Sequence, residues 1–322
     1  MNRDTNFFND LDAVMRQDFG GRGLLASLPP SPLAQVARSL LTARRVILLT
    51  GFPVRLGNKR FTGETDGPSG TANLAAGLTA CGCTVTVVTD WPSIPLLKAA
   101  LAFRAPAAIL RELPQDGTDS FIRRLLLECR PTHFISLERP GKALDGHCHN
   151  MRGGIIDDMM ADSSPFLSEA RRMKAVTISI GDGGNEMGMG TFRSQILAGV
   201  PGGDVICTAE GADFTLASGV SNWWGWGLSA ILSMYTHDSG HTADHLFRTD
   251  AGTHSPRPGK GSLLLPTAAE ETELLRRVVA AGGVDGCTGQ PSLSVDALPL
   301  NSHLEILSAV RELTISRISQ AA

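Results

Sequence analysis

Segments typical of β-strands alternate with segments typical of α-helices along most of this 322-residue chain. Short apolar runs rich in β-branched residues predict strands at 45–50, 84–89, 132–137, 175–180 and 204–208. Helices are predicted at 71–81, 94–103, 120–129, 165–174, 220–235, 268–281 and 303–318. This alternation favours an α/β fold with a mostly parallel β-sheet and helices on both faces, a Rossmann-like layered architecture.

The two ends of the chain fit the same layered picture. Residues 1–40 are predicted to form a helical N-terminal arm, because Phe8, Leu11 and Met15 recur at helical spacing. The stretch 237–261 is polar and contains Gly and Pro, which predicts a surface excursion. No linker divides the chain convincingly, so we expect residues 1–322 to form a single domain.

Charge and hydropathy exclude several classes of partner. A net charge of −3 gives no electrostatic reason to expect nucleic acid or a membrane surface. No apolar run approaches the roughly 20 residues that a membrane-spanning helix needs. The N-terminus carries Asp4, Asp10 and Asp12 and has no apolar segment typical of a secretory signal. We therefore expect a cytoplasmic protein that acts on a small molecule; its oligomeric state is not indicated.

The cysteines and histidines give weak signals. The six cysteines form no C-x-x-C pair, and disulfides are not expected. Cys148 lies in a polar loop and is the candidate for a reactive thiol, while its neighbours His147 and His149 are weak metal candidates. His237, His241 and His245 recur every four residues, but the residues between them are poor helix formers.

A glycine-rich turn with three polar side chains follows the predicted strand at 175–180. The run 181–186 reads G-D-G-G-N-E. Its glycines permit a sharp turn and close approach to a ligand, with peptide N–H groups free to hold an anion. A purely structural turn needs one or two glycines and a cap, whereas this one adds Asp182, Asn185 and Glu186. The pattern favours a functional site at the carboxyl edge of the sheet.

A second acidic turn follows the predicted strand at 45–50. The run 63–70 reads G-E-T-D-G-P-S-G, with Pro68 well placed in the first turn of a helix. One interpretation is that Asp66 only caps that helix. Because Glu64 and Asp66 repeat the arrangement of the turn at 181–186, we favour a pocket shared by both turns.

Other polar residues near predicted strand and helix ends are candidates for substrate binding. An arginine at the carboxyl end of a strand suits a carboxylate, which points to Arg139 and then to Arg152 in the following loop. A surface ion pair with Glu138 is the alternative for Arg139. The candidates for orienting hydrogen bonds are Asn150, Asn185, Ser221 and Asn222.

Three common motifs are absent. The chain has no G-K-[ST] phosphate loop and no G-x-S-x-G nucleophile elbow. Glu186 stands where a dinucleotide fingerprint would have its third glycine. Nucleotide and serine-hydrolase functions therefore lose their main support.

Taken together, these motifs resemble the D-glutamate cyclase family from about residue 45 to the end. The matching residues are T-G-F-P at 50–53, E-T-D-G-P at 64–68, E-R at 138–139, D-G at 145–146, Asn150, the run 181–190, D-F at 213–214, G-V-S-N-W at 219–223, V-D-A-L-P at 295–299 and His303. The resemblance implies a hydro-lyase that converts D-glutamate into 5-oxo-D-proline and water. This chain departs from the family in having His147, Cys148 and His149 where tyrosines are usual, and Gly211 where an acidic residue is usual.

Such a cyclisation needs a base for the amine and an activated γ-carboxyl group. Asp182, Glu186, Glu64 and Asp66 would supply a base and an acid, because like charges in one pocket push their pKa values apart. The same cluster could instead hold Mg²⁺ or Mn²⁺, and the sequence does not choose between these. Arg139 and Arg152 would hold the α-carboxylate. The alternatives are a related lyase or hydrolase acting on another small acidic amino acid or lactam, and a non-catalytic binding protein.

One geometric prediction follows from the parallel sheet. The turns at Glu64–Asp66 and Asp182–Glu186 should face one cleft, with 138–139 and 221–222 on its rim. Burial beside Trp223 and Phe52 should raise the pKa of at least one carboxylate.

Overall fold

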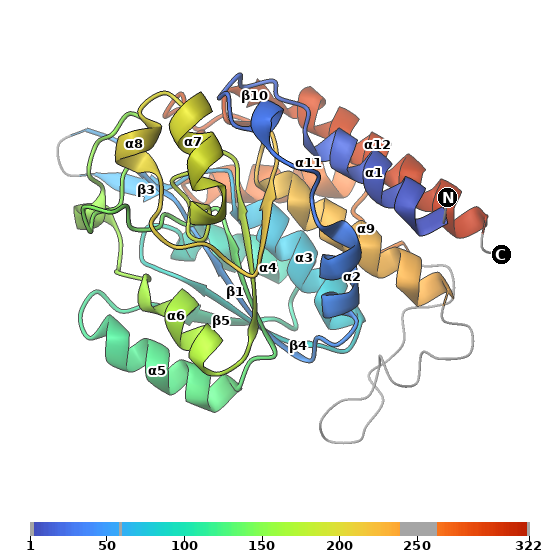
Figure 1. The fold of residues 1–322 in the computed structure, drawn as a ribbon, viewed down its shortest axis with the longest axis horizontal. Coiled ribbons are helices and arrows are strands. Elements are labelled where there is room, and N and C mark those ends of the chain that lie inside the picture. Colours follow the sequence, from blue (N-terminus) through green and yellow to red (C-terminus); the bar gives the residue numbers. More distant parts are fainter. Residues whose placement is uncertain (1–2, 58–59, 239–262, 321–322) are drawn as a thin grey trace.

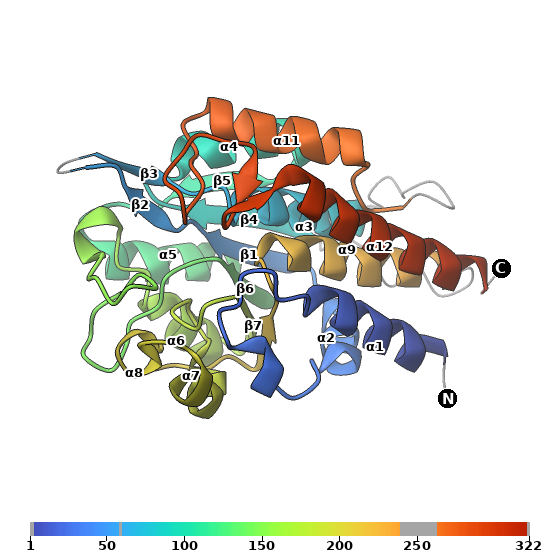
Figure 2. The ribbon, with the colours of Figure 1, turned by 90° about the horizontal axis from the view of Figure 1, so that it is seen from above.

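A parallel sheet of six strands forms the centre of the computed structural model, which describes residues 3–57, 60–238 and 263–320. The strands are β1 (Arg45–Thr50), β4 (Thr84–Thr89), β5 (Ile109–Glu112), β6 (His133–Leu137), β7 (Val176–Gly181) and β8 (Phe214–Ala217). They lie in the order β5-β4-β1-β6-β7-β8. Figure 1 shows the whole fold, and the order from β5 to β7 can be followed by the labels in Figure 2. The α/β fold expected from the sequence is confirmed.

The strand order contains a topological switch point. Numbered by chain order within this sheet, the six strands lie as 3-2-1-4-5-6. From β1 the chain adds β4 and β5 on one side, and it then returns to place β6 on the other side of β1. The connections that follow the neighbouring strands β1 and β6 therefore leave in opposite directions. Their last residues, Thr50 and Leu137, are paired in register. A crevice at the carboxyl ends of these two strands is where open sheets of this type bind ligands.

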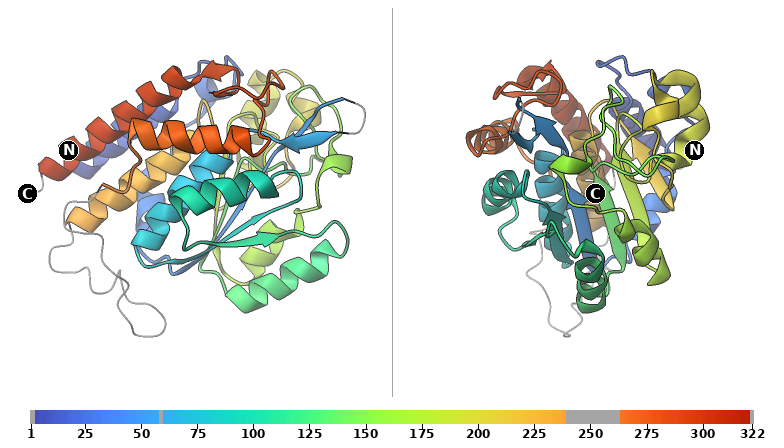
Figure 3. Two further views of the ribbon diagram at one scale, coloured as in Figure 1. Left: turned by 180° about the vertical axis from the view of Figure 1, so that it is seen from behind. Right: turned by 90° about the vertical axis from the view of Figure 1, so that its left-hand side faces the viewer.

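Helices cover both faces of the sheet (Figures 2 and 3). One face packs against α3 (Pro68–Ala80), α4 (Ile94–Arg104) and α9 (Asn222–Asp238), and the other against α5 (Thr118–Cys129) and α6 (Pro165–Arg172). Alternation along β1 feeds both cores, with Val46 and Leu48 in the first and Ile47 and Leu49 in the second. Burial on both faces explains why these strands are continuous apolar runs.

The N-terminal and C-terminal helices form an outer layer together. The N-terminal arm consists of α1 (Arg3–Met15), η1 (Leu25–Ser27) and α2 (Leu33–Leu40), so its helical character is confirmed. Helix α1 lies along α12 (Leu300–Ser319), with α11 (Ala268–Ala280) beside them (Figures 1 and 2). Arg317 Nη2 pairs with Asp4 Oδ1 at 2.7 Å across the two ends of the chain.

The strand predicted at 204–208 is wrong. These residues lie in and just after the short helix α8 (Gly203–Ile206), which comes directly after α7 (Arg193–Gly199). Two 3₁₀ turns, η2 (Asp157–Met159) and η3 (Gly190–Phe192), come earlier in the chain. Gly202 has a φ of 70°, and a Cβ on Gly203 would lie 2.3 Å from the carbonyl oxygen of Ile196. This left-handed turn against α7 gives the apolar run a helical path. The two edge strands of the sheet are β5 and β8, and the sequence predicted neither.

Two short hairpins complete the described fold. They pair β2 (Pro53–Arg55) with β3 (Phe61–Gly63), and β9 (Ser294–Val295) with β10 (Leu298–Pro299). Most of the surface excursion expected at 237–261, including His241 and His245, lies outside the described residues. Within the described ranges, no helix has the length and apolar character needed to cross a membrane.

Candidate active site

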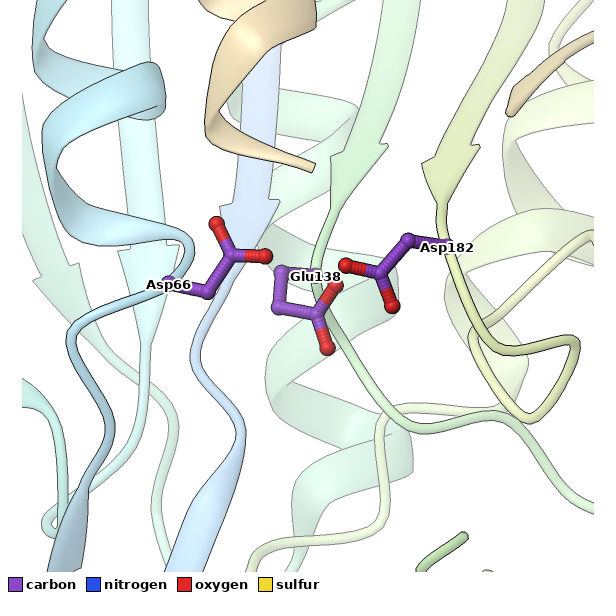
Figure 4. A group of neighbouring side chains, drawn as sticks. All are labelled: Asp66, Glu138 and Asp182. Carbon is purple, nitrogen blue, oxygen red and sulfur yellow. The ribbon is translucent and has the colours of Figure 1, made fainter. Parts of the chain in front are cut away.

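Three buried carboxylates meet at the carboxyl edge of the sheet, next to the switch point. Asp66 lies between β3 and α3, Glu138 directly follows β6, and Asp182 directly follows β7. One carboxylate oxygen from each lies within 4.8 Å of the other two (Figure 4). The shared location that the sequence predicted for the two acidic turns is therefore what the structure contains, with Glu138 between them.

The carboxylate of Asp66 joins the starts of two helices. Its Oδ1 accepts hydrogen bonds from the N–H groups of Gly67 (2.9 Å) and Asn222 (2.8 Å), and its Oδ2 accepts from the N–H of Ser221 (3.0 Å). Burial and the charge of Asp296 raise the pKa of Asp66, against the opposite effect of these donors. Asp66 does not cap α3 as the sequence allowed, because the N-cap of that helix is Gly67 and Asp66 bonds no N–H group within it; it bonds instead the N–H groups at the start of α9.

Glu138 occupies the centre of the group in a strained backbone conformation. Its φ is 47°, in the left-handed region that side-chain-bearing residues rarely adopt. Its Oε2 is buried and has no hydrogen-bond partner. Burial, followed by the charges of Glu186 and Asp66, raises the pKa of Glu138 well above its ordinary value. A protonated carboxyl group is the form that this environment favours.

Asp182 is held by a helix start on one side and by an arginine on the other. Its Oδ2 accepts from the N–H of Ser221 at 3.2 Å. Its Oδ1 forms an ion pair with Arg22. The same N–H of Ser221 therefore links Asp182 to Asp66, so the two acidic turns are tied together through the residue before α9.

Glu186 stabilises its own turn. Its Oε1 accepts from the N–H groups of Asp182 (3.0 Å) and Gly183 (2.8 Å), and its Oε2 accepts from that of Gly184 (2.7 Å). The sequence suggested that these N–H groups are free to hold an external anion. That expectation is wrong, because the carboxylate of Glu186 occupies the position of the anion.

Arg22 and Asp296 belong to the site although sequence reasoning missed them. Arg22 lies in the segment between α1 and η1, and its Nη2 pairs with Asp296 Oδ1 at 3.0 Å. Asp296 occupies the turn of the β9–β10 hairpin with a φ of 55°. Burial alone lowers the pKa of Arg22, but Asp296, Glu138 and Glu186 outweigh it and raise that pKa. Its position between Gly21 and Gly23 was the available signal; Asp296 had none beyond the resemblance.

These groups open into a cavity of about 380 Å³. Glu64, Glu138, Asp182, Glu186 and Asp296 supply its acidic walls, and Arg22, Arg55 and Arg152 its basic ones. Burial, followed by the charges of Asp296 and Asp66, raises the pKa of Glu64. Phe52 lines the cavity as expected. Trp223 is not among the lining residues; it is buried and donates its Nε1–H to His303 Nδ1 at 3.0 Å.

Arg139 does not reach the cavity. Its side chain is 0% exposed and pairs with Asp90 Oδ2 at 2.8 Å. Its other donors bond to Ser163 Oγ and to the carbonyl oxygens of Gly51 and Ala161. Both predictions for Arg139, substrate binding and a surface ion pair with Glu138, are therefore wrong. Its guanidinium is buried, and its donors bond to other parts of the fold.

Asn222 is also a structural residue. Its Oδ1 accepts from the N–H groups of Gly67 (3.0 Å) and Gly70 (2.6 Å), and its Nδ2 donates to the carbonyl oxygen of Thr65. With all of these groups engaged and buried, the side chain locks the start of α9 onto the start of α3 and has no free group for a substrate.

The remaining predicted binding residues lie in or beside the cavity. Asn150, Arg152 and Asn185 line it, and Asn185 Nδ2 donates to the carbonyl oxygen of His149 at 2.8 Å. Asn150 Oδ1 accepts from the N–H groups of Arg152 and Gly154, which shapes the loop at the cavity mouth. Ser221 contributes its N–H, while its Oγ is buried without a partner. Substrate contacts by these four residues stay predictions.

Comparison with known proteins places the chain in a family. The family model described as "D-glutamate cyclase-like, C-terminal" matches residues 11–311. The chain belongs to the D-glutamate cyclase-like family. A curated relative, "D-glutamate cyclase, mitochondrial" from Homo sapiens, is 28% identical over an alignment that covers 96% of this chain and 52% of the relative. The chain thus spans about half the length of that relative. The expected cytoplasmic location stays a prediction.

The loop at 147–149 holds one cysteine between two histidines. Cys148 is buried, and burial raises the pKa of its thiol to about 12. The reactive thiol suggested by the sequence is therefore wrong. His147 pairs with Asp157 (2.6 Å) and His149 with Asp145 (2.9 Å), so the two imidazoles face different carboxylates and do not converge on one ion.

Proposed function

We propose that this protein is a hydro-lyase that cyclises D-glutamate to 5-oxo-D-proline with loss of water. The observation that carries the proposal is the buried carboxyl group of Glu138, with one oxygen unpartnered, between the carboxylates of Asp66 and Asp182. Membership of the D-glutamate cyclase-like family supports the choice of substrate.

The proton balance of the reaction fits a pair of unlike carboxyl groups. The α-ammonium group must lose two protons as nitrogen forms its bond to the γ-carbon. The departing γ-oxygen must gain two protons to leave as water. Ring closure is intramolecular, so proton transfer and activation of the carboxylate dominate the barrier. The site must therefore hold both an ionised carboxylate and a protonated one.

The surroundings of each residue suggest how these roles divide. Asp182, which forms an ion pair with Arg22, would accept the proton of the ammonium group. Glu138, whose pKa is raised, would donate a proton to the departing oxygen, and Glu64 would assist from the same wall. Asp66 and Glu186, which the sequence also put forward as catalytic, would hold the two turns in place.

The same cluster offers a place for a hard cation. Asp66, Glu138 and Asp182 would be the ligands of Mg²⁺ or Mn²⁺, since all three present oxygen donors and Glu138 Oε2 is buried without a partner. Such an ion would polarise the γ-carboxyl group. Asp182 is already paired with Arg22, and Asp66 accepts three N–H bonds. We therefore favour acid–base catalysis by the carboxyl groups.

A chiral assay tests the function directly. We expect D-glutamate to be converted to 5-oxo-D-proline much faster than L-glutamate to its lactam, and the rate to persist after treatment with a chelator. Equal rates for the two enantiomers, or no product from either, would refute the assignment. If chelation abolishes the activity and Mg²⁺ or Mn²⁺ restores it, the ion activates the γ-carboxyl group, and the proton of Glu138 does not.

Two further readouts separate the neighbouring functions. Incubation with 5-oxo-D-proline reports ring opening, because a catalyst accelerates both directions. Thermal stabilisation by D-glutamate without turnover would identify a binding protein instead of an enzyme.

A further inference from the structure

The segment between α1 and η1 inserts a basic side chain among the acidic walls of the cavity. Gly21 and Gly23, on either side of Arg22, have φ values of 60° and 83°. A Cβ on Gly23 would lie 2.3 Å from the carbonyl oxygen of Gly199, so the segment packs directly against the end of α7. This tight path fixes the direction of Arg22 from outside the sheet.

Arg22 differs from the other two arginines of the cavity. Arg55 donates from Nη2 to both carboxylate oxygens of Asp158, at 2.6 and 2.8 Å, and Arg152 is exposed. Of the three arginines that line the cavity, Arg22 is the one that pairs with its acidic walls, through Asp182 and Asp296. An anion that enters the cavity meets this guanidinium beside two carboxylates.

An α-amino acid carries a carboxylate and an ammonium group on one carbon. We propose that Arg22, Asp182 and Asp296 bind this head group, with Arg22 on the α-carboxylate and the two aspartates beside the ammonium group. The proposal rests on the proposed function and deepens it. It also supplies the cation on the α-carboxylate that Arg139 cannot provide.

The chemistry of ring closure favours the α-carboxylate over the γ-carboxylate as the partner of Arg22. A guanidinium stabilises a carboxylate as an anion, and a stabilised anion is a poorer electrophile. The γ-carboxyl group has to be attacked and therefore needs an acid, which Glu138 provides. The α-carboxylate does not react, so a strong charge-assisted contact there costs no reactivity. It also brings the ammonium group next to Asp182.

Ligands that lack one group at a time test this assignment. Calorimetry would compare wild-type protein with Arg22→Gln on D-glutamate, 5-oxo-D-proline and 4-aminobutanoate. The second ligand keeps the α-carboxylate and lacks the γ-carboxylate, and the third lacks the α-carboxylate. We expect the variant to bind the first two about 10- to 100-fold more weakly, the scale of a charged hydrogen bond, and 4-aminobutanoate without loss. Arg22→Lys should fall between, because it keeps the charge and loses the fork.

Arg123→Gln is the matched control, because it removes an arginine that lies outside the cavity, where it pairs with Glu169. Its affinities should equal those of the wild type. Thermal unfolding of each variant checks the fold. An Arg22→Gln protein that binds 5-oxo-D-proline normally would overturn the proposal. Weaker binding of both D-glutamate and 4-aminobutanoate, with 5-oxo-D-proline unaffected, would place Arg22 on the γ-carboxylate instead.

The failure of the proposed function looks different. A wild-type protein that binds another D-amino acid but not D-glutamate, with the same dependence on Arg22, would refute the substrate and keep the head-group role. A wild-type protein that binds none of the amino acids would refute both.

Discussion

Glu138 is the residue where stability and function are most opposed. Its backbone is left-handed, and conformations of this kind cost about 1–3 kcal/mol in residues other than glycine. Its carboxyl group is buried without a full set of partners. Neither feature helps the fold, but together they place a protonated acid between two carboxylates.

This opposition predicts a pH-dependent gain in stability for Glu138→Gln. Because burial raises the pKa of Glu138 in the folded protein, the unfolded chain loses its proton first as pH rises. The stability of the wild type therefore falls from the ordinary glutamate pKa upwards, until the raised pKa is passed. The neutral glutamine escapes this loss. We expect the melting temperature of the variant to exceed that of the wild type by a margin that grows from pH 5 to pH 8.

The same variant should lose turnover by on the order of 10², the scale of an acid–base group. Glu210→Gln, which changes a carboxylate outside the cavity, is the control for both measurements. A margin in melting temperature that shrinks as pH rises would mean that Glu138 is ionised in the folded protein.

Site residues could be predicted when their neighbours in the sequence formed a recognisable turn. Residues whose role depends on contacts made only after folding could not be predicted. Asp66 and Asp182 could be predicted because each stands in a glycine-bounded turn after an apolar run. Arg22 and Asp296 could not, because their roles depend on contacts with turns more than 100 residues away. Arg139 was misjudged for a related reason, since its partner Asp90 follows a different strand.

Among the elements, α3 and α9 determine where the two acidic turns meet. These helices cross at their first turns, where a Cβ on Gly225 would lie 2.2 Å from the carbonyl oxygen of Gly70. Asn222 then bonds the N–H of Gly70. The close approach of the two backbones is what allows one carboxylate, that of Asp66, to accept from the N–H of Gly67, just before α3, and from the N–H groups at the start of α9.

We therefore expect Gly225→Ala to lower the free energy of unfolding by about 3 kcal/mol, because the added methyl meets backbone and forces the helices apart. Gly77→Ala, on the same interface, is the control. Its Cβ would have only side-chain atoms as its nearest neighbours, the closest being Ser229 Oγ at 3.0 Å, and a helical alanine is intrinsically favoured over glycine. Urea unfolding of both variants measures the difference. An equal loss of unfolding free energy in the two variants would show that α3 and α9 can move apart at Gly225 without an added cost.

Helices and central strands were the elements most accessible from the sequence. The predicted strands at 45–50 and 84–89 match β1 and β4, because buried parallel strands are continuous β-branched runs. The error at 204–208 arose because a run of that length fits a strand or one helical turn equally well. The short β9–β10 hairpin leaves almost no periodic signal.

At the scale of the whole molecule, the cavity draws on both ends of the chain. The segment carrying Arg22 comes from the N-terminal arm, and the hairpin carrying Asp296 comes after α11. Between them lie the turns after β3, β6 and β7. The alternating pattern predicted a parallel sheet. The order of its strands depends on the position to which each crossover connection brings the next strand, and no single segment of the sequence encodes that position.

Hydrogen exchange should report this assembly as a set of distant segments that respond together. Binding of 5-oxo-D-proline is expected to slow exchange in residues 20–24, 182–186 and 285–297 at once, because all three surround the cavity. Mass spectrometry of peptides from bound and free protein measures it. Protection limited to the smaller hollow around Lys142, Ser164 and Glu210 would place the ligand elsewhere.

The start of α9 at Asp66 also has an electrical consequence. The N-terminus of a helix acts as about half a positive charge, and that of α9 is bonded to this carboxylate. This charge comes from peptide groups, so it appears in no count of lysines and arginines. It cannot be titrated away, and in a buried position salt screens it weakly. The acidic edge of this sheet therefore repels an incoming anion less than its side chains alone suggest.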